Sequence, residues 1–466
     1  MKEIKKSVCL FCSLGCGLAC RVVGREAVAI DYDRENPVNK GSLCPRGYYN
    51  FELLNHPARL TVPSVRGNPA SFSEAFSFVR RELDLLDPGA VAIVVSPLAS
   101  LEDGGAAAAL AAKLKTRYLC VGGELADDDA GLGAAWRLAE DHPATLEDIE
   151  NSDQLLIIGD VLTRSPVLSR RINAVKAKRG KITVVDPHRS HTAWFADKHL
   201  TLKPGMEAVF AAALVRMLSG AGEGELSDLA NKIGLPIESL REVAADFSSA
   251  AAGTVIVVPS ANKRRNDLLT YFVRVFAGLA DKKWIVFYGG GNTIGLNALF
   301  NDQQPGRAHY YELAKKLKQG VIQGLILLGE DLSDLERFAP KLLIGSRFFP
   351  PKFKNGVCFP QASHLELEGS YLFSGSRNSR ALPMVPAAGG RGIAALLAEL
   401  FDLDVEAAKK QAAETAANMV GEIFDLGTVI NEGTKLEPLP DYPVENVTHF
   451  AGNDLAKNFF WYRAKG

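Results

Sequence analysis

The stretch Cys9-Leu-Phe-Cys12-Ser-Leu-Gly-Cys16, together with Cys44 in Gly41-Ser-Leu-Cys-Pro-Arg-Gly47, decides how this chain is interpreted. Three thiolates on one tight loop can hold three corners of an iron–sulfur cubane, and a remote fourth thiolate completes the set. Zinc sites usually pair two Cys-x-x-Cys knuckles, and Cys44 has neither a second knuckle nor a nearby histidine. The spacing predicts a [4Fe–4S] cluster held by Cys9, Cys12, Cys16 and Cys44, with zinc or unrelated buried thiols as the alternatives.

The other three cysteines are interpreted as structural. Cys20 follows Cys16 by four residues and is expected to be a packed neighbour, or the substitute ligand if Cys44 does not serve. Cys120 and Cys358 lie in strand-like runs. Cysteines clustered at one end of a long chain favour metal over a disulfide framework. The first residues lack an apolar export segment, so a cytoplasmic protein is expected.

Composition excludes several classes of protein. Of the 466 residues, 47% are hydrophobic and 23% are charged, which is typical of globular domains. The 53 basic and 54 acidic residues give a net charge of −1, so no nucleic-acid partner is expected. No apolar run is long enough to predict a membrane span. The length suggests about three domains.

Beyond residue 60, apolar runs alternate with helical patterns. The predicted strands cover residues 91–96, 154–159, 181–186, 254–259, 284–289, 324–329 and 342–345, and the predicted helices include 105–115, 166–178, 207–218, 267–279 and 310–318. This alternation predicts an α/β fold with parallel sheets covered by helices on both faces. Such sheets bind ligands at the carboxyl ends of their strands. Glycines at those ends either allow close approach to a ligand or simply form tight turns.

The expected organisation has a small N-terminal cluster module and two α/β units. Residues 1–60 form the [4Fe–4S] module. Residues 61–140 and 330–427 form one discontinuous α/β domain, and residues 141–329 form a Rossmann-like nucleotide-site domain. Residues 428–466 form a tail, in which Phe459–Tyr462 are a candidate docking segment for a partner.

These motifs resemble the iron–sulfur molybdopterin oxidoreductases, which include formate dehydrogenases, nitrate reductases and the large hydrophilic subunit of respiratory complex I. The resemblance covers residues 7–60 and 145–380 and rests on the cysteine motif followed by an ordered series of segments: Leu146–Gly159, Ser165–Ile172, Val184–Arg189, Leu202–Gly205, Gly289–Gly295, Leu328–Asp331 and Glu368–Arg377. It implies that Arg46 bridges the cluster to a pterin. It also implies a nucleotide or pterin site that includes Gly159, Asp186, His188, Gly290, Asn292 and Gly329.

The residues support part of this assignment without the resemblance. Asp186 ends a predicted strand, where a carboxylate can accept hydrogen bonds from a base or a ribose. Gly289–Gly291 and Asn292 can bring backbone N–H groups towards a pyrophosphate. The structural alternative for Arg46 is a solvated surface arginine.

Two departures from the family pattern affect the expected function. Catalytic members coordinate molybdenum or tungsten with a Cys, selenocysteine, Ser or Asp ligand, and the corresponding stretch 121–131 has no Cys or Ser, only the acidic run Asp127–Asp129. Family enzymes also carry a C-terminal β-rich domain that binds one pterin, and no strand series of that kind follows residue 390. Molybdopterin guanine dinucleotide is therefore possible as a cofactor but not favoured.

Three functions remain in competition. The favoured hypothesis is an iron–sulfur electron-transfer subunit that assembles with other iron–sulfur or flavin subunits, docking through the regions of Leu10-Phe11 and Tyr48-Tyr49. The second is a catalytic molybdenum or tungsten oxidoreductase of formate or formylmethanofuran type, completed by a partner chain. The third is a scaffold whose cluster only stabilises the N-terminal module.

Overall fold

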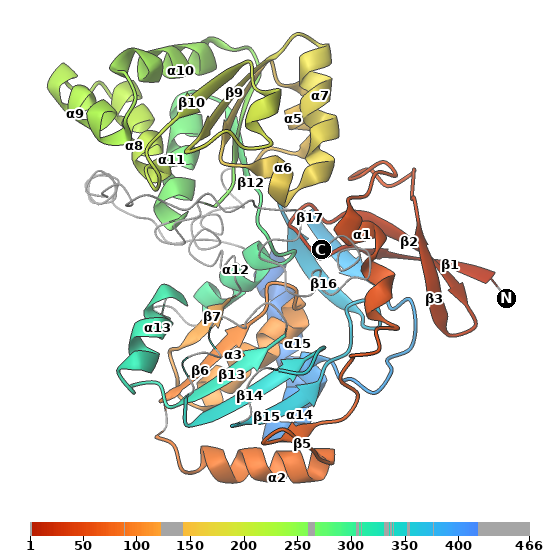
Figure 1. Cartoon of the computed structure of the whole chain (residues 1–466). Helices are drawn as coiled ribbons and strands as arrows, with labels where there is room; N and C mark the ends of the chain where they lie inside the picture. Colours follow the sequence, from red (N-terminus) through yellow and green to blue (C-terminus); the bar gives the residue numbers. More distant parts are fainter. Residues whose placement is uncertain are drawn as a thin grey trace.

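Two parallel β-sheets and a small antiparallel sheet form the framework of the computed structural model (Figure 1). The structure describes residues 2–417 except 88, 123–142, 260–265, 304–306, 309, 330–334, 336, 337, 339, 352–354 and 376. Among the described residues, no helix is long and apolar enough to cross a membrane.

The N-terminal module is built on a three-stranded antiparallel sheet. Its strands are β1 (Lys2–Val8), β2 (Gly17–Val23) and β3 (Glu26–Asp31), and β2 and β3 form a hairpin around Gly24. The loop between β1 and β2 carries Cys9, Cys12 and Cys16. Cys44 comes immediately before the short helix α1 (Pro45–Tyr48), which the 3-10 turn η1 (Asn50–Leu53) follows.

A five-stranded parallel sheet forms the upper lobe in Figure 1. The strands are β8 (Gln154–Ile158), β9 (Lys181–Asp186), β10 (Lys198–Thr201), β11 (Gly253–Val257) and β12 (Lys283–Val286), in the spatial order β10-β9-β8-β11-β12. The chain runs from the central strand β8 to β9 and β10 on one side, and then returns to form β11 and β12 on the other side of β8. The strand order therefore reverses between β8 and β11. This is a doubly wound arrangement, and its ligand crevice is expected at the carboxyl ends of β8 and β11.

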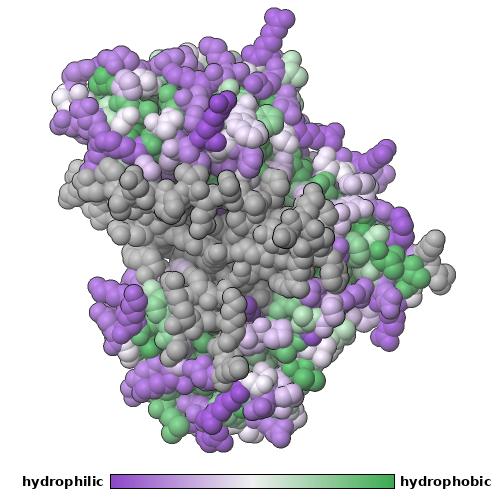
Figure 2. Space-filling view, viewed as in Figure 1, coloured by the Kyte–Doolittle hydropathy of each residue, from purple (hydrophilic) through white to green (hydrophobic). Residues whose placement is uncertain are grey.

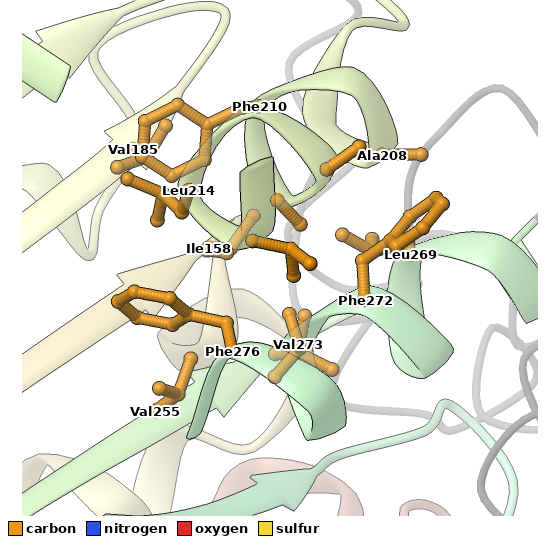
Figure 3. Close-up of a cluster of buried hydrophobic side chains, with 14 of the residues drawn as sticks. Ile158, Val185, Ala208, Phe210, Leu214, Val255, Leu269, Phe272, Val273 and Phe276 are labelled. Atoms are coloured by element: carbon orange, nitrogen blue, oxygen red, sulfur yellow. The ribbon is translucent and has the colours of Figure 1, made fainter. Parts of the chain in front are cut away.

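Helices cover both faces of this sheet, which explains why its strands are almost wholly apolar. One face packs against α8 (Glu207–Leu218), α9 (Glu223–Ile233), α10 (Ile237–Ser249) and α11 (Asn266–Leu279). Figure 3 shows side chains of α8 and α11, including Phe210 and Phe276, pointing onto strand residues such as Ile158 and Val255. The other face packs against α5 (Leu146–Asn151), α6 (Val161–Arg164), η2 (Pro166–Leu168) and α7 (Ser169–Ala177).

The seven-stranded sheet forms the lower lobe in Figure 1. Its order is β5-β4-β15-β14-β13-β6-β7, with β6 (Val91–Val95), β7 (Leu119–Val121), β13 (Gly324–Leu328), β14 (Leu342–Arg347) and β15 (Val357–Pro360) parallel. The short strands β4 (Ser64–Val65) and β5 (Asn68–Pro69) add an antiparallel edge. Within the parallel part, the order reverses between β6 and β13, which gives the molecule a second switch point.

The helices around this sheet come from distant parts of the chain. They are α2 (Phe72–Leu83), α3 (Leu101–Lys113), α12 (Thr293–Gln303), α13 (Tyr310–Lys318), α14 (Ile393–Phe401) and α15 (Val405–Ala417). The α15 helix lies against Gly105 of α3, where an added Cβ would meet Ala408 O at 2.6 Å. The Ala-rich segment after residue 393 therefore packs on the seven-stranded lobe, as two helices separated by Asp402 in a left-handed conformation.

All seven strands and all five helices named from the sequence are present within a few residues of their predicted bounds. The domain boundary predicted at residue 329 differs from the structure, because β13 pairs with β6, and α12 packs with α3 in the core of the seven-stranded lobe. The division between the two sheets therefore follows β12 at Val286. An apolar strand pattern shows that a strand is buried but not which sheet it joins, which accounts for the difference.

A two-stranded hairpin lies between the lobes beside the N-terminal module (Figure 1). It consists of β16 (Gly369–Phe373) and β17 (Arg377–Ala381) and was not predicted. Its apolar side chains Tyr371 and Phe373 pack with Val8 and Leu10 of the module. The hairpin thus joins the cluster loop to the rest of the molecule.

Candidate functional site

The four predicted cysteine ligands line a single pocket. The backbone N–H of Cys9 donates to the carbonyl of Cys16 at 2.8 Å, which closes the loop that holds three of the thiols. Cys9, Cys12 and Cys16 are buried, whereas Cys44 is partly exposed. The pocket is completed by side chains from the cluster loop, from the turn before α1 and from residues 165–167 of the five-stranded lobe.

The chemistry of this donor set fits a cluster better than a single ion. In the part of the chain that the structure describes, no three Cys, His, Asp or Glu side chains are arranged to hold a metal ion. A zinc ion requires its sulfur ligands within about 2.3 Å of one point. Four thiols that line one pocket are instead the donor set that a [4Fe–4S] cluster takes.

Burial and the neighbouring thiols raise the pKa of two of the pocket cysteines, Cys9 and Cys16. Burial raises the pKa of Cys9, and the neighbouring thiols of Cys44 and Cys12 raise it further. Burial likewise raises the pKa of Cys16. Thiolates at such positions need nearby positive charge, which bound iron would supply.

Arg46 meets the pocket from α1 and is almost fully buried. Its guanidinium donates to the carbonyl of Phe11 at 3.2 Å and to the carbonyl of Arg164. Its Nε is buried and has no hydrogen-bond acceptor among the described residues. Burial acts to lower the pKa of Arg46, but the thiols of Cys44, Cys12 and Cys9 outweigh it and the pKa is raised. Arg46 is therefore an interior cation beside the thiols rather than a solvated surface arginine.

Residues from the segment after β12 and from the β16–β17 hairpin hold the cluster loop from outside. The N–H of Ser13 donates to Tyr288 O at 3.1 Å, and Ser13 O accepts from the N–H of Ser374 at 3.0 Å. The Ser13 hydroxyl accepts from the N–H of Tyr288 at 2.7 Å. The Oγ atoms of Ser13 and Ser374 lie 2.6 Å apart. Gly15 has φ +63° and lies against the ring of Phe373, where an added Cβ would approach to 2.6 Å. The loop therefore has little freedom to move.

Gly159, Asp186 and His188 lie at the carboxyl edge of the five-stranded sheet. Gly159 has φ +92°, and an added Cβ would lie 3.2 Å from Val258 O, across the switch point. Asp186 ends β9, is buried, and accepts from the N–H of His188 at 3.2 Å. The half-exposed His188 ring lies 3.5 Å from the same carboxylate. The structure therefore brings these three predicted residues to one sheet edge.

Gly329 marks the other switch point. It ends β13 with φ +107°, and an added Cβ would lie 2.5 Å from the Cβ of Ser96 at the end of β6. Its N–H donates to the carbonyl of Ser346 at 2.9 Å. Packing between strand ends is thus sufficient to require glycine at this position.

Gly290 and Asn292 lie where the two lobes and the cluster loop meet. Gly290 packs on Pro97, and the N–H groups of Gly291 and Asn292 donate to Leu10 O and Pro97 O, each at 2.9 Å. The Asn292 side chain is fully buried and bonded to the backbone of Ala99 and Leu372. The prediction that this turn offers N–H groups to a pyrophosphate is therefore corrected, because Gly291 and Asn292 use theirs to join parts of the protein.

Comparison with known protein families agrees with this architecture. Residues 2–56 match the molybdopterin oxidoreductase Fe4S4 domain, and residues 59–391 match the molybdopterin oxidoreductase domain. The chain belongs to the molybdopterin oxidoreductase family. The Fe4S4 domain supports a [4Fe–4S] cluster as cofactor, and the larger domain makes a pterin cofactor possible.

Similar proteins include characterised oxidoreductases. The chain is 27% identical to a nitrate reductase of Klebsiella oxytoca over 55% of its own length and 33% of the relative's. It is 27% identical to the alpha subunit of F420-dependent formate dehydrogenase 2 of Methanococcus maripaludis, over 54% of its own length and 42% of the relative's. It thus spans about a third to two fifths of these relatives.

A solved structure with the same fold is acetylene hydratase from Pelobacter acetylenicus. The TM-score is 0.61 at 16% sequence identity, and the match covers 86% of this chain and 69% of that chain. At this identity the likeness concerns the fold alone.

Several predictions for this family member fall on residues that the structure does not describe. The acidic run Asp127–Asp129 and the tail 428–466 lie outside the described residues. The docking prediction for Leu10 and Phe11 is wrong, because both side chains are at most 1% exposed and belong to the core. Phe11 lines the thiol pocket and Leu10 packs with Tyr371 and Phe373 of the hairpin, which explains why both are buried.

Two residues near the cluster loop of this family member were not assigned a role from the sequence. Ser374 contacts Ser13, and Arg377 donates to the carbonyl of Leu14 at 2.6 Å. Arg377 was identified only as the arginine that ends the segment Glu368–Arg377. The sequence motif therefore singled out Arg377, but it gave no indication that this side chain contacts the cluster loop.

Asp186 should make the protein less stable at neutral than at acidic pH. Burial raises its pKa to about 6 from an ordinary value of 3.8. Because the folded carboxyl binds its proton more tightly than the unfolded one, its stabilising contribution is complete below about pH 4 and is lost as the pH rises through about 6. We expect Asp186→Asn to increase the free energy of unfolding at pH 8 by up to about 3 kcal/mol and to have no such effect at pH 4.

Denaturant or thermal unfolding at the two pH values tests this expectation. Asp228→Asn, at an exposed position of α9, is the control and should change stability by no more than about 0.5 kcal/mol at either pH. A loss of stability in Asp186→Asn at pH 8 would contradict the prediction and would mean that the ionised carboxylate is stabilising.

Proposed function

We propose that this chain is an iron–sulfur electron-transfer subunit of a multi-subunit oxidoreductase, with one [4Fe–4S] cluster on Cys9, Cys12, Cys16 and Cys44. The observation that carries this proposal is the single pocket lined by the four thiols, beside a buried arginine. Cys44 is partly exposed, and Leu43 and Val167 next to it are partly buried. A cluster in this pocket would lie close enough to the surface to exchange electrons with a partner.

The turns predicted to hold a pterin nucleotide support the electron-transfer role over catalysis. The N–H groups of Gly159, Gly291, Asn292 and Gly329 all donate to protein carbonyls. Anion sites of Gly-rich turns need such groups free to point at the phosphate. In this chain these four groups serve to join neighbouring segments.

The catalytic alternative has its own support. Proteins similar to this chain include a nitrate reductase and a formate dehydrogenase alpha subunit. The buried carboxylate of Asp186 also lies at the edge where a doubly wound sheet receives a nucleotide. When bound, a molybdenum or tungsten pterin would supply the redox chemistry, and Asp186 with His188 would contact its nucleotide. A partner chain would complete that site.

Metal analysis separates these proposals. For the purified native complex we expect four iron atoms for each copy of this chain and no stoichiometric molybdenum or tungsten in the chain. Iron, molybdenum and tungsten are measured together by mass spectrometry, after the subunits are separated under anoxic conditions. One molybdenum or tungsten per chain would establish the catalytic alternative, with Asp127–Asp129 as ligand candidates. Iron that cannot be reduced by any partner subunit would favour the scaffold.

We further propose that the complex is cytoplasmic and contains other iron–sulfur or flavin subunits. No disulfide joins any of the seven cysteines, which lie in the described part of the chain, and a reducing compartment keeps thiols in this state. Tyr48 and Tyr49 remain candidates for docking, since both are partly exposed and Tyr48 stacks on the exposed Tyr32. Figure 2 shows hydrophobic atoms gathered over the three-stranded sheet, where Ile4, Val23 and Val28 are exposed. A protein partner is expected on this side of the module.

A further inference from the structure

Three residues of the β16–β17 hairpin contact the cluster loop. Phe373 lies under Gly15, Ser374 bonds to Ser13 through backbone and hydroxyl, and Arg377 donates to Leu14 O. These residues are about 360 positions away from the loop in the sequence. The hairpin is therefore part of the wall that supports the cysteines.

The guanidinium of Arg377 is held in a fixed position. Its Nη2 donates to the carbonyl of Leu14 at 2.6 Å and its Nε to the carbonyl of Ser374 at 3.0 Å. Its Cζ lies 5.9 Å from the centre of the Phe373 ring. Because two acceptors in different segments share one planar group, the charge of Arg377 stays beside the loop.

Arg46 and Arg377 each donate a hydrogen bond to a different part of the cluster loop. Arg46 donates to Phe11, which lies between Cys9 and Cys12, and Arg377 donates to Leu14, which lies between Cys12 and Cys16. Each interval between consecutive cysteines of the loop thus has one carbonyl held by one arginine. The motif after Cys44 accounts for the first arginine, and nothing in the cysteine motif points to the second.

We propose that Arg377 is a second cationic positioning residue of the iron–sulfur centre, which fixes the Cys12–Cys16 interval and stabilises the reduced state of the cluster. The inference rests on the proposed function, because it requires a cluster on the four cysteines. A cluster with four thiolate ligands becomes more negative when it accepts an electron, and its potential depends on nearby charge and solvent exposure. A partly buried cation held against the loop between Cys12 and Cys16 favours that added charge, since charge interactions are stronger inside a protein than in water. Arginine is always protonated at neutral pH, so the charge is permanent.

A redox titration followed by electron paramagnetic resonance tests the role of Arg377. The full chain is compared as wild type, Arg377→Gln and Arg377→Lys, with iron content measured for each. At a fixed potential we expect the ratio of reduced to oxidised cluster to be about tenfold lower in Arg377→Gln, which corresponds to about 59 mV for a one-electron couple. Arg377→Lys retains the charge and should remain within about threefold of wild type.

Arg380→Gln is the matched control on the same hairpin. Arg380 is exposed, and its ion pair is with Glu368 at the surface, so its removal should leave the ratio unchanged. Loss of iron in Arg377→Gln with retention of iron and potential in Arg377→Lys would also support the inference.

Three results would overturn it: an unchanged potential in Arg377→Gln, an equal shift in Arg380→Gln, or loss of iron in both Arg377 variants. The last result would mean that shape rather than charge is required. A wild-type chain without any cluster would instead refute the proposed function, and the iron measurement distinguishes that failure from failure of the inference.

Discussion

Cys44→Ala is expected to strip the chain of its iron and to abolish the broad visible absorbance of an iron–sulfur cluster. Cys44 is the one proposed ligand outside the loop between β1 and β2, and it lies at the partly exposed side of the pocket. Without it, the three loop thiols leave one iron corner open to water, in a position that solvent can reach. Iron analysis and the visible spectrum of the anoxically purified variant measure the effect.

Cys20→Ala is the control for this substitution. Cys20 is also buried, but it lies within β2 opposite Lys5 and Ile30 and does not line the pocket. Burial raises the pKa of its thiol to about 11, as expected for an inert packed cysteine. The variant should retain its full iron content. Full iron in Cys44→Ala, or loss of iron in Cys20→Ala, would contradict the proposed ligand set.

Local patterns in the sequence were sufficient to predict many of the helices and strands, although not the β16–β17 hairpin. The cysteine spacing requires a tight loop, and the structure has one between β1 and β2. Strand β8 and helix α8 appear where the apolar run and the helical periodicity predicted them. These features depend on residues close together in the chain, and backbone geometry and burial act directly on such patterns.

Features that depend on distant residues could not be predicted. The pairing of β13 with β6 joins segments more than 220 residues apart, and nothing in the apolar run 324–328 specifies that partner. Asn292 was expected to face a ligand because it follows three glycines. In the structure it joins Ala99 to Leu372, since those chains approach from elsewhere in the fold.

The glycines at the switch points illustrate why a motif alone does not establish a cofactor site. Gly159 and Gly329 both have positive φ and both lie against the end of a neighbouring strand. A doubly wound sheet requires close packing at the place where the strand order reverses, whether or not a nucleotide binds there. A family member can therefore retain its glycine motifs for folding after a cofactor contact is no longer made.

A buried ion pair joins the N-terminal module to the seven-stranded lobe. Arg59 donates to the two carboxylate oxygens of Glu366 at 2.8 and 2.5 Å, and the side chains are 5% and 1% exposed. Glu366 also accepts from the N–H groups of Ser363 and Ala388. Arg59 further contacts Leu54 O and the ring of Phe348. The pair thus connects the chain just after the cluster module to the segment that leads into the hairpin.

Glu366→Gln is expected to lower the free energy of unfolding by about 3–5 kcal/mol, because it leaves the charge of Arg59 buried without its counterion. Denaturant titration at neutral pH measures the loss, and parallel iron analysis shows whether the module releases its cluster first. Arg59→Met combined with Glu366→Leu should cost less than the sum of the two single changes, since the double variant leaves no isolated charge. Glu225→Gln breaks the exposed pair with Arg216 and is the matched control, for which we expect a loss below about 1 kcal/mol. Equal losses in Glu366→Gln and Glu225→Gln would show that burial of the Arg59–Glu366 pair does not govern how firmly the cluster module is held.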